Sequence, residues 1–352
     1  MPTCDVSIIA LGRDFSNARL QRIMRSLKDQ QISYEVFTKR GGRIYRVIAA
    51  WIVPWRAKGK VLFTPDPESA IALSYIARLR RKKWAVDVRE DYKLLIEDRA
   101  WAKGSKKVIA SVMADWAVSA SASADLTITV DDWVKPLTAK NRIVVHNAPD
   151  ARFLPEPTDI EAKPRAIYVG DVRQSRGLFS MLRAIEMTDE WTLDIIGNVA
   201  PQDQSKLDQW RKNSKAATRV RFHGNLSPKD AWLFAKGAWV GLALLNPTPA
   251  FNRAWPTKIG EYIACGLPVI ATDLPRIAEV ILKDPRPGAL VETLNEEVIA
   301  MQTAGILNSW AENPDEYGEV RTRTLLNVES WRSAASYDRI AREISGLIDQ
   351  VR

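Results

Sequence analysis

The sequence is poor in cysteine and histidine, two residue types that often build cross-links and metal sites. Its 352 residues include only Cys4, Cys265, His146 and His223. Two cysteines so far apart predict no disulfide framework, and their scarcity favours a reducing compartment. Neither residue type shows the spacing of metal ligands, so we expect no metal site.

Long apolar runs and several well-known motifs are also lacking. No stretch approaches about 18 uninterrupted apolar residues, and the N-terminus leads directly into the strand-like segment VSIIAL. Neither a membrane span nor a signal peptide is therefore expected. There is no Walker loop, no GxGxxG and no GxSxG, so none of the enzyme classes that these motifs mark is indicated. We expect a cytoplasmic protein, either free or peripheral at the cytosolic face of a membrane.

Acidic residues are missing from one stretch of the first half. Between Glu35 and Asp66 there is no acid, but Ile, Val, Tyr and Trp residues alternate there with seven bases, which are Lys39, Arg40, Arg43, Arg46, Arg56, Lys58 and Lys60. This mixture suits the headgroup layer of an anionic membrane, which residues 39–60 and a second basic cluster at 78–83 would contact. An equally good interpretation makes residues 44–52 the buried face of an ordinary helix, because periodicity alone does not separate the two.

The positive charge is concentrated in the first half. Residues 1–150 contain 26 Lys and Arg against 16 Asp and Glu, whereas the whole chain has 51 against 42. A basic half without a recognisable reader motif is only an electrostatic hint, so we expect no nucleic-acid partner.

Short β-branched segments alternate with helical patterns along the chain. The expected strands are 6–10, 34–37, 61–64, 84–88, 126–130 and 143–145 in the first half, and 166–169, 192–196, 219–222, 240–245, 267–272 and 288–291 in the second. The expected helices are 17–30, 43–53, 68–82, 105–119, 132–138, 178–185, 229–235 and 257–265, followed by one long helical run from Ser330 onward. This order predicts right-handed crossovers and doubly wound parallel sheets.

A segment with four prolines, residues 146–165, interrupts the alternation. We expect two α/β domains of Rossmann-like type, 1–150 and 166–330, joined by a linker at 151–165 and followed by a C-terminal helix at 331–352. Two such domains facing one another would enclose a deep cleft.

The most informative stretch is TKIGEYIACGLPVIATD, residues 257–273. It predicts a helix that begins after Pro256, stops at Gly266 and leads into a buried strand. Helices and strands joined in this way form parallel α/β sheets, whose ligands gather at the carboxyl ends of the strands. Glu261, expected in the first helical turn, and Lys258 would lie near the preceding loop, within reach of a ligand.

Four segments carry a family resemblance. They are the linker VVHNAPDARF, the loop YVGDVRQSRGLFSMLRAI at 168–185, the segment VRFHGNLS at 220–227 and the block that contains Glu261 and continues to PGALVE. Over about residues 140–295 the chain resembles the glycosyltransferase family 4 group. The resemblance implies a GT-B fold, in which two Rossmann-like domains face each other across a cleft and the C-terminal helix crosses back to the first domain.

The resemblance also implies a donor site in the second domain. Arg176 stands where the family has a lysine, and an arginine fork beside a helix N-terminus and the flexible backbone of Gly170 and Gly177 is suited to stabilising a departing diphosphate. Glu261 would accept hydrogen bonds from the ribose hydroxyls. Further donor contacts are expected from Arg173, His223, Arg253, Thr257 and Lys258.

Plainer interpretations of these residues stay open. Glu261 could be a partner of the helix dipole, Lys258 a solvated side chain and His223 a structural residue. One departure is clear: Arg253 stands where the family has a glutamate that touches the donor sugar. Arg253 could bind an acidic donor sugar or could simply lie at the surface. Because the glutamate is replaced, the sequence does not decide whether the transfer retains or inverts the anomeric configuration.

Acceptor contacts are expected from the first domain. The strand at 84–88 delivers Glu90 and Asp91 as candidates for positioning or deprotonating an acceptor hydroxyl, with an ordinary charged loop as the alternative. Arg13, Asn17 and Arg19 are candidates for binding an acceptor phosphate. Histidine is missing before His146, so the histidine that many family members use in this domain has no counterpart.

Together these features predict a metal-independent, hexosyltransferase-like enzyme. It would move a sugar from a nucleotide diphosphate of UDP or GDP type, as substrate rather than cofactor, to a lipid-linked or glycan acceptor in polysaccharide or glycoconjugate synthesis. Two alternatives remain: a noncatalytic GT-B scaffold that binds nucleotide or glycan, and a sugar-nucleotide epimerase of the same fold.

Overall fold

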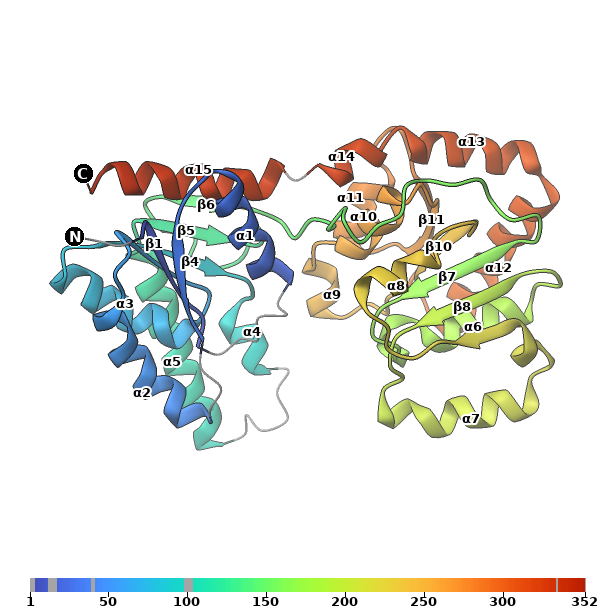
Figure 1. Ribbon diagram of the computed structural model, residues 1–352. Helices are drawn as coiled ribbons and strands as arrows, with labels where there is room; N and C mark the ends of the chain where they lie inside the picture. The colour runs from blue at the N-terminus through green and yellow to red at the C-terminus, as the bar shows by residue number, and fades with distance from the viewer. Residues whose placement is uncertain (1–3, 12–17, 39–41, 98–103, 334, 352) are drawn as a thin grey trace. The chain divides into compact units, whose positions relative to one another are not determined.

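The computed structural model describes residues 4–11, 18–38, 42–97, 104–333 and 335–351, which form two compact units. Unit 1 comprises the chain up to Asn147 together with the C-terminal segment from Ala334, and unit 2 runs from Ala148 to Ser333. Each unit is a sheet with helices on both faces (Figure 1). In the described part of the chain no helix is both long and apolar enough to cross a membrane.

Unit 1 is built on a six-stranded sheet of order β2-β1-β3-β4-β5-β6, in which every paired neighbour is parallel. Its strands are β1 (Val6–Ile9), β2 (Tyr34–Phe37), β3 (Val61–Thr64), β4 (Lys83–Val88), β5 (Leu126–Thr129) and β6 (Arg142–Val144). The central strands β1, β3 and β5 are buried along their whole length, as expected of a sheet covered on both faces.

The helices of unit 1 are α1 (Ala18–Asp29), α2 (Arg43–Arg56), α3 (Pro67–Leu79), α4 (Tyr92–Glu97), α5 (Ser105–Ala122) and α15 (Ala335–Asp349). Helix α2 packs on α3 and α3 on α5, whereas α15 packs on α1. The C-terminal helix therefore belongs to unit 1, where Ser26 Oγ donates to Asp338 Oδ1 at 2.8 Å.

Unit 2 repeats this plan with a parallel sheet of order β12-β11-β10-β7-β8-β9. Its strands are β7 (Arg165–Val169), β8 (Thr192–Ile196), β9 (Val220–Phe222), β10 (Val240–Ala243), β11 (Val269–Thr272) and β12 (Gly288–Val291). Its α-helices are α6 (Leu178–Glu186), α7 (Gln204–Asn213), α8 (Pro228–Leu233), α9 (Pro249–Arg253), α10 (Thr257–Ala264), α11 (Pro275–Ile281), α12 (Glu296–Glu312), α13 (Pro314–Leu325) and α14 (Val328–Arg332).

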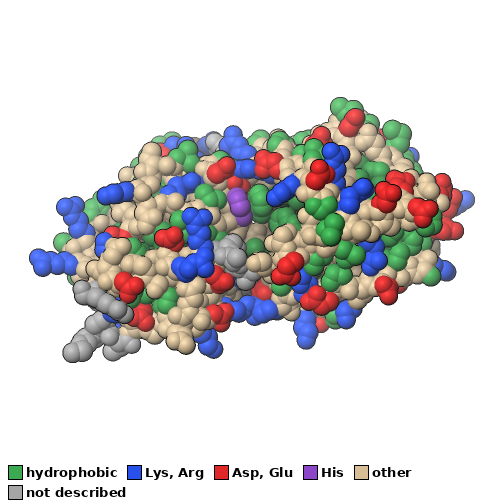
Figure 2. All heavy atoms as spheres, turned by 90° about the horizontal axis from the view of Figure 1, so that it is seen from above, with side chains coloured by type: hydrophobic (Ala, Val, Ile, Leu, Met, Phe, Trp, Pro, Cys, Tyr) green, Lys and Arg blue, Asp and Glu red, His purple; other side chains and the backbone are tan. Residues whose placement is uncertain are grey.

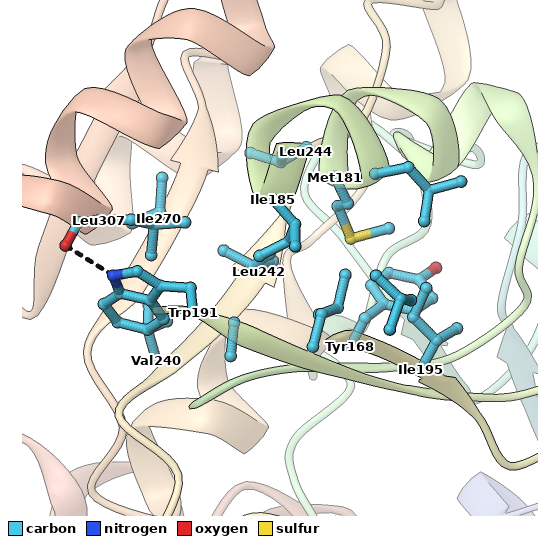
Figure 3. Close-up of a cluster of buried hydrophobic side chains, with 14 of the residues drawn as sticks. Tyr168, Met181, Ile185, Trp191, Ile195, Val240, Leu242, Leu244, Ile270 and Leu307 are labelled. Atoms are coloured by element: carbon cyan, nitrogen blue, oxygen red, sulfur yellow. Dashed lines mark hydrogen bonds between the residues drawn. The ribbon is translucent and has the colours of Figure 1, made fainter. Parts of the chain in front are cut away.

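Apolar side chains fill both sides of the unit 2 sheet. One cluster joins the sheet to α6, α12 and α13, and a second joins it to α8, α10 and α11. In the first cluster the indole of Trp191 is 1% exposed, and its Nε1 donates to the carbonyl of Leu307 at 2.9 Å (Figure 3). A large aromatic side chain can be buried so deeply because its one polar atom is satisfied.

Two expected helices differ from the structure. Residues 132–138 form turns, and the peptide bond Lys135-Pro136 among them is cis. The few apolar residues of this segment do not make a helical pattern, and Pro136 has no backbone N–H to donate to a helical hydrogen bond. The single helical run from Ser330 onward is two helices, α14 and α15, which belong to different units. The segment expected to be a plain loop before Pro256 contains the short helix α9, capped by Thr248, whose Oγ1 accepts from the Phe251 backbone.

Candidate functional site

The expected donor residues of unit 2 lie where its strand order reverses. Strand β7 pairs with β8 on one side and with β10 on the other. After β7 the chain continues to β8, and after β10 it continues to β11, so the connections that follow these two neighbouring strands run in opposite directions. Such a switch point is where open α/β sheets bind ligands. The chain after β7 carries Gly170 and Arg176, and the chain after β10 leads to Lys258 and Glu261.

Glycines let the backbones meet closely at this edge. Gly177 has φ +81°, and a Cβ there would lie 2.0 Å from the carbonyl oxygen of Leu244, just after β10. Gly177 also precedes α6, so only a residue without a side chain brings the N-terminus of this helix against β10. Gly170, with φ +153°, follows β7, and a Cβ on it would lie 3.8 Å from Cε of Lys258.

Arg176 lies between the loop after β7 and helix α9. Its guanidinium stands over the ring of Phe251 at 5.7 Å, and its Nη2 lies 3.9 Å from Asp171 Oδ2. Arg173 contacts the same carboxylate at 2.5 Å. The two bases that the sequence offers for a diphosphate therefore share one exposed acid, Asp171, and surface ion pairs of this kind contribute little free energy.

Lys258 and Glu261 form an ion pair on α10, with Lys258 Nζ 2.8 Å from Glu261 Oε2. The ammonium group also stands 4.9 Å from the ring centroid of Trp232. Glu261 is the fifth residue of α10 and not in its first turn, which corrects the expected position. Because the dipole effect fades beyond the first turn, the interpretation of Glu261 as a dipole partner loses its basis.

The neighbouring Tyr262 fixes α10 to the sheet. Its side chain is fully buried, and its hydroxyl accepts from the Val169 backbone at 3.1 Å and donates to the Leu242 carbonyl at 3.3 Å. Gly241 makes room for the ring, since a Cβ there would lie 2.3 Å from it. Burial raises the pKa of Tyr262 well above its ordinary value, so the hydroxyl keeps its proton.

His223 is held by a buried carboxylate. Its Nε2 lies 2.7 Å from Asp194 Oδ1, and its ring packs 4.3 Å from that of Phe234. Burial acts to raise the pKa of Asp194, but the hydrogen bonds from His223 and Arg221 outweigh it and lower the pKa. One imidazole nitrogen is therefore engaged within the protein, which is the structural role that the sequence left open for His223.

The remaining donor candidates lie around the same edge. Thr257 is the first residue of α10, and its backbone N–H donates to the Trp255 carbonyl at 2.9 Å. Arg253 is the exposed last residue of α9. Helix α9 thus brings Phe251 to Arg176 at one point and ends on Arg253, so the chain between β10 and α10 forms one wall of the candidate site.

The acceptor candidates of unit 1 have more diverse surroundings. Glu90 is exposed beyond the end of β4, and Asp91 accepts a hydrogen bond from the Lys93 backbone at 2.9 Å, which places it at the start of α4. Arg13 and Asn17 lie outside the described residues.

Arg19 is a structural residue in this unit. It is 5% exposed, and its Nε and Nη2 donate to Asp87 at 3.0 and 2.8 Å while its Nη1 donates to the Val145 carbonyl at 2.8 Å. Every guanidinium nitrogen is therefore used internally, so the expected role as an acceptor-phosphate ligand is not what this geometry provides. Arg89, which precedes Glu90 in the chain, also contacts Asp87, with its Nε 2.7 Å from Asp87 Oδ2.

Three aromatic side chains belong to the donor edge and were not expected there: Tyr168, Trp232 and Phe251. The Tyr168 hydroxyl donates to the Asp171 carbonyl at 2.7 Å, and burial raises the pKa of Tyr168 to about 12 although Arg176 opposes the shift. Its position near the carboxyl end of β7, two residues before Gly170, was a usable signal. Among the described residues, no group of three or more His, Cys, Asp and Glu is placed to hold a metal ion.

The sequence of residues 150–321 matches the model of the family described as glycosyl transferases group 1. This match covers most of unit 2, including the donor edge. No curated protein matches the chain in sequence.

Solved structures resemble the whole chain. Sucrose-phosphate synthase from Thermosynechococcus elongatus aligns with a TM-score of 0.70 at 13% identity, covering 99% of this chain and 98% of that one. Anabaena HepE, solved in complex with UDP, aligns with a TM-score of 0.71 at 14% identity, covering 97% of this chain and 100% of that one. At such low identity these likenesses establish the fold, which is GT-B, and not the substrate.

Proposed function

Because residues 150–321 match the model of the glycosyl transferases group 1 family, we propose that the protein transfers a sugar from a nucleotide-diphosphate sugar bound at the donor edge of unit 2. The observation that carries this proposal is the gathering of Gly170, Arg176, Lys258 and Glu261 at the switch point of the sheet. The complexes of HepE with UDP and UDP-glucose support a uridine nucleotide as the first candidate.

The diphosphate would take the place that Asp171 occupies beside Arg176 and Arg173. When the bond between the anomeric carbon and the diphosphate oxygen breaks, negative charge grows on the leaving group. Fixed positive charge and the N–H groups at the start of α6 stabilise that charge. Losing the exposed contacts to Asp171 costs little, since this acid is 65% exposed and its ion pairs are weak.

Glu261 would bind the ribose. Its side chain is 17% exposed, so it is partly shielded from water, and its carboxylate has acceptor positions beyond the one used by Lys258. Lys258, 2.8 Å away and beside Gly170, would then stand between the ribose and the diphosphate. The assignment requires no metal ion, because Arg173, Arg176 and Lys258 supply the positive charge.

The sugar would meet the chain between β10 and α10, which includes α9. Arg253 replaces the acid of the family at this point, and a guanidinium there fits a donor sugar that carries a carboxylate. We assign the acceptor to unit 1, where Glu90 or Asp91 would receive the proton of the attacking hydroxyl. We propose a lipid-linked or glycan acceptor of cell-surface polysaccharide synthesis, which an anionic membrane surface bound by unit 1 would present to the enzyme.

Titration calorimetry of the full chain with UDP, GDP and ADP tests the donor assignment. We expect one of these to bind and Glu261→Ala to weaken it by about 10- to 150-fold, because hydrogen bonds to a charged group contribute about 1.5 to 3 kcal/mol. Glu312→Ala, at an exposed position of α12, is the matched control and should bind like the unmodified protein.

Transfer is tested by incubating the chain with UDP-sugars, including a uronic acid donor, and lipid-linked acceptors, and by measuring released UDP. Absence of binding by all three nucleotides, or equal binding by Glu261→Ala and Glu312→Ala, would refute the donor site. Binding without release of UDP from any donor would instead favour the noncatalytic scaffold.

A further inference from the structure

Helix α2 is apolar on two opposite sides. Ala49, Ala50 and Val53 face the core and are buried. The outer side carries a second row at helical spacing, Ile44, Ile48, Trp51, Ile52 and Trp55, whose side chains are 40 to 79% exposed. The interpretation of residues 44–52 as the buried face of an ordinary helix is therefore wrong, because small residues occupy that face and the large ones point outward.

The row on α2 continues over the next two helices. Tyr75 and Leu79 of α3 are exposed, as are Val108, Ile109, Val112 and Trp116 of α5. Three aromatic rings link these helices. The ring centroid of Trp51 lies 6.0 Å from that of Tyr75, and the centroid of Tyr75 lies 6.4 Å from that of Trp116. Helices α2, α3 and α5 lie side by side on one face of the unit 1 sheet (Figure 1). We call the exposed apolar side chains of these helices the three-helix face.

This concentration is unlike the rest of the described surface. Of the 19 large apolar side chains that are exposed there, 12 belong to α2, α3 and α5. Figure 2 looks down on the α15 side of unit 1, where charged side chains of both signs alternate with small apolar areas. A contiguous exposed apolar surface of this kind marks a site of interaction with a protein or a membrane.

Basic residues border the three-helix face. Arg56, Lys58, Arg78, Arg81 and Lys107 are exposed, whereas no acid occurs between Glu35 and Asp66, which includes all of α2. The exposed acid of α5, Asp115, is paired with Lys93 at 2.7 Å. Part of the expected cluster at 78–83 is engaged elsewhere. Arg80 and Lys82 donate to the carbonyl of Ala57, and Lys83 pairs with Asp125.

We propose that the three-helix face binds the surface of an anionic lipid bilayer, with α2, α3 and α5 lying along it. Indole and phenol rings favour the headgroup region, aliphatic side chains favour the acyl boundary beneath it, and bordering bases attract anionic headgroups. A protein partner would also cover apolar side chains, but it would not by itself explain why the stretch that contains α2 holds bases and no acid. The inference goes beyond the donor assignment and does not depend on it.

The contributions of the two kinds of residue differ in their response to salt. Each base near an anionic surface contributes a factor of about five to binding, and salt screens this factor within a Debye length. Each large apolar side chain that enters the acyl boundary contributes about tenfold, independent of salt. Binding should therefore weaken at high salt without disappearing.

Flotation of the full chain with vesicles of phosphatidylcholine and anionic phosphatidylglycerol tests the proposal, because bases near an anionic surface strengthen binding. The variant Ile44→Ser, Ile52→Ser, Val112→Ser changes three exposed positions on α2 and α5. Its matched control, Leu294→Ser, Met301→Ser, Leu326→Ser, changes three positions of unit 2 that are exposed to a similar degree. We expect the first variant to lose at least about 100-fold in vesicle binding and the control to bind like the unmodified chain.

Two further measurements complete the test. Arg56→Gln with Lys58→Gln should reduce binding about 25-fold at low salt, whereas Lys163→Gln with Lys229→Gln should not. Hydrogen exchange of the vesicle-bound chain should show protection in α2 and α5. Absence of vesicle binding, equal binding by the first variant and its control, or a dimer that the first variant abolishes in vesicle-free solution would overturn the proposal.

Discussion

Replacing Asp87 with asparagine tests the account of unit 1 most directly. Asp87 is the penultimate residue of β4 and is fully buried, with Arg19 Nη2 at 2.8 Å and Arg89 Nε at 2.7 Å. Asp87→Asn keeps the shape of the side chain but removes its charge and turns one acceptor into a donor that faces guanidinium donors. Two nearly buried cations would then remain without their carboxylate.

The expected loss is about 3 to 5 kcal/mol of the free energy of unfolding of unit 1, as for other buried pairs from which one partner is removed. A related effect follows from pH. Burial would raise the pKa of Asp87, but the charges of Arg19 and Arg89 lower it from 3.8 to about 2. The charged pair thus contributes about 2 kcal/mol that is fully present above about pH 4 and is lost as the pH falls toward 2.

Native-state hydrogen exchange, read by mass spectrometry, separates the two units because peptides of α1 and β4 report only on unit 1. The control is Asp115→Asn, which removes an exposed pair with Lys93 and should cost at most about 0.5 kcal/mol. Equal losses for the two variants would refute the reasoning. So would an Asp87→Asn protein whose unit 1 loses stability between pH 4 and pH 2 as steeply as the unmodified protein.

Two further predictions concern unit 2. Gly177→Ala should destabilise unit 2 by more than about 2 kcal/mol, because its Cβ would collide with the Leu244 backbone. Gly224 has a similar φ but open space around it, so Gly224→Ala should cost about 1 kcal/mol. Urea denaturation of both variants measures the two losses, and equal losses would contradict the close approach at Gly177. Lys258→Met should weaken binding of a nucleoside diphosphate about tenfold but leave the nucleoside alone unaffected; calorimetry with the UDP and uridine pair decides, and a parallel loss for both ligands would remove Lys258 from the diphosphate.

The sheets could be predicted closely from the sequence because β-branched runs alternate with helical spacing at a regular distance. β2, β3, β8 and β12 begin and end at the expected residues. The helix expected at 132–138 failed because a few apolar residues before a proline do not define a helix. The division between α14 and α15 is not visible in their composition, since it depends on which unit each helix packs against.

The site was predictable to a different depth in each unit. In unit 2 the glycines and charged residues of the donor edge stand in short motifs, so sequence alone selected Arg176 and Glu261. In unit 1 the fate of Arg19 depends on Asp87, 68 positions away, and no local pattern reveals such a partner. The carboxylate was itself a signal, because an acid within the buried run WAVDV requires a base.

The anchoring of Tyr262 divides the candidate site into a constant part and an adjustable part. Its hydroxyl joins α10 to both β7 and β10, so Glu261 keeps its height above the sheet unless the core itself is rebuilt. The chain between β10 and α10 is tied instead at its start, where the Leu245 carbonyl accepts from Thr272 Oγ1 at 2.8 Å and the Asn246 backbone donates to the Ser175 carbonyl at 3.0 Å. A redesign that seeks a new donor sugar can therefore vary residues 246–256 while Glu261, at the nucleotide end of the site, keeps its position.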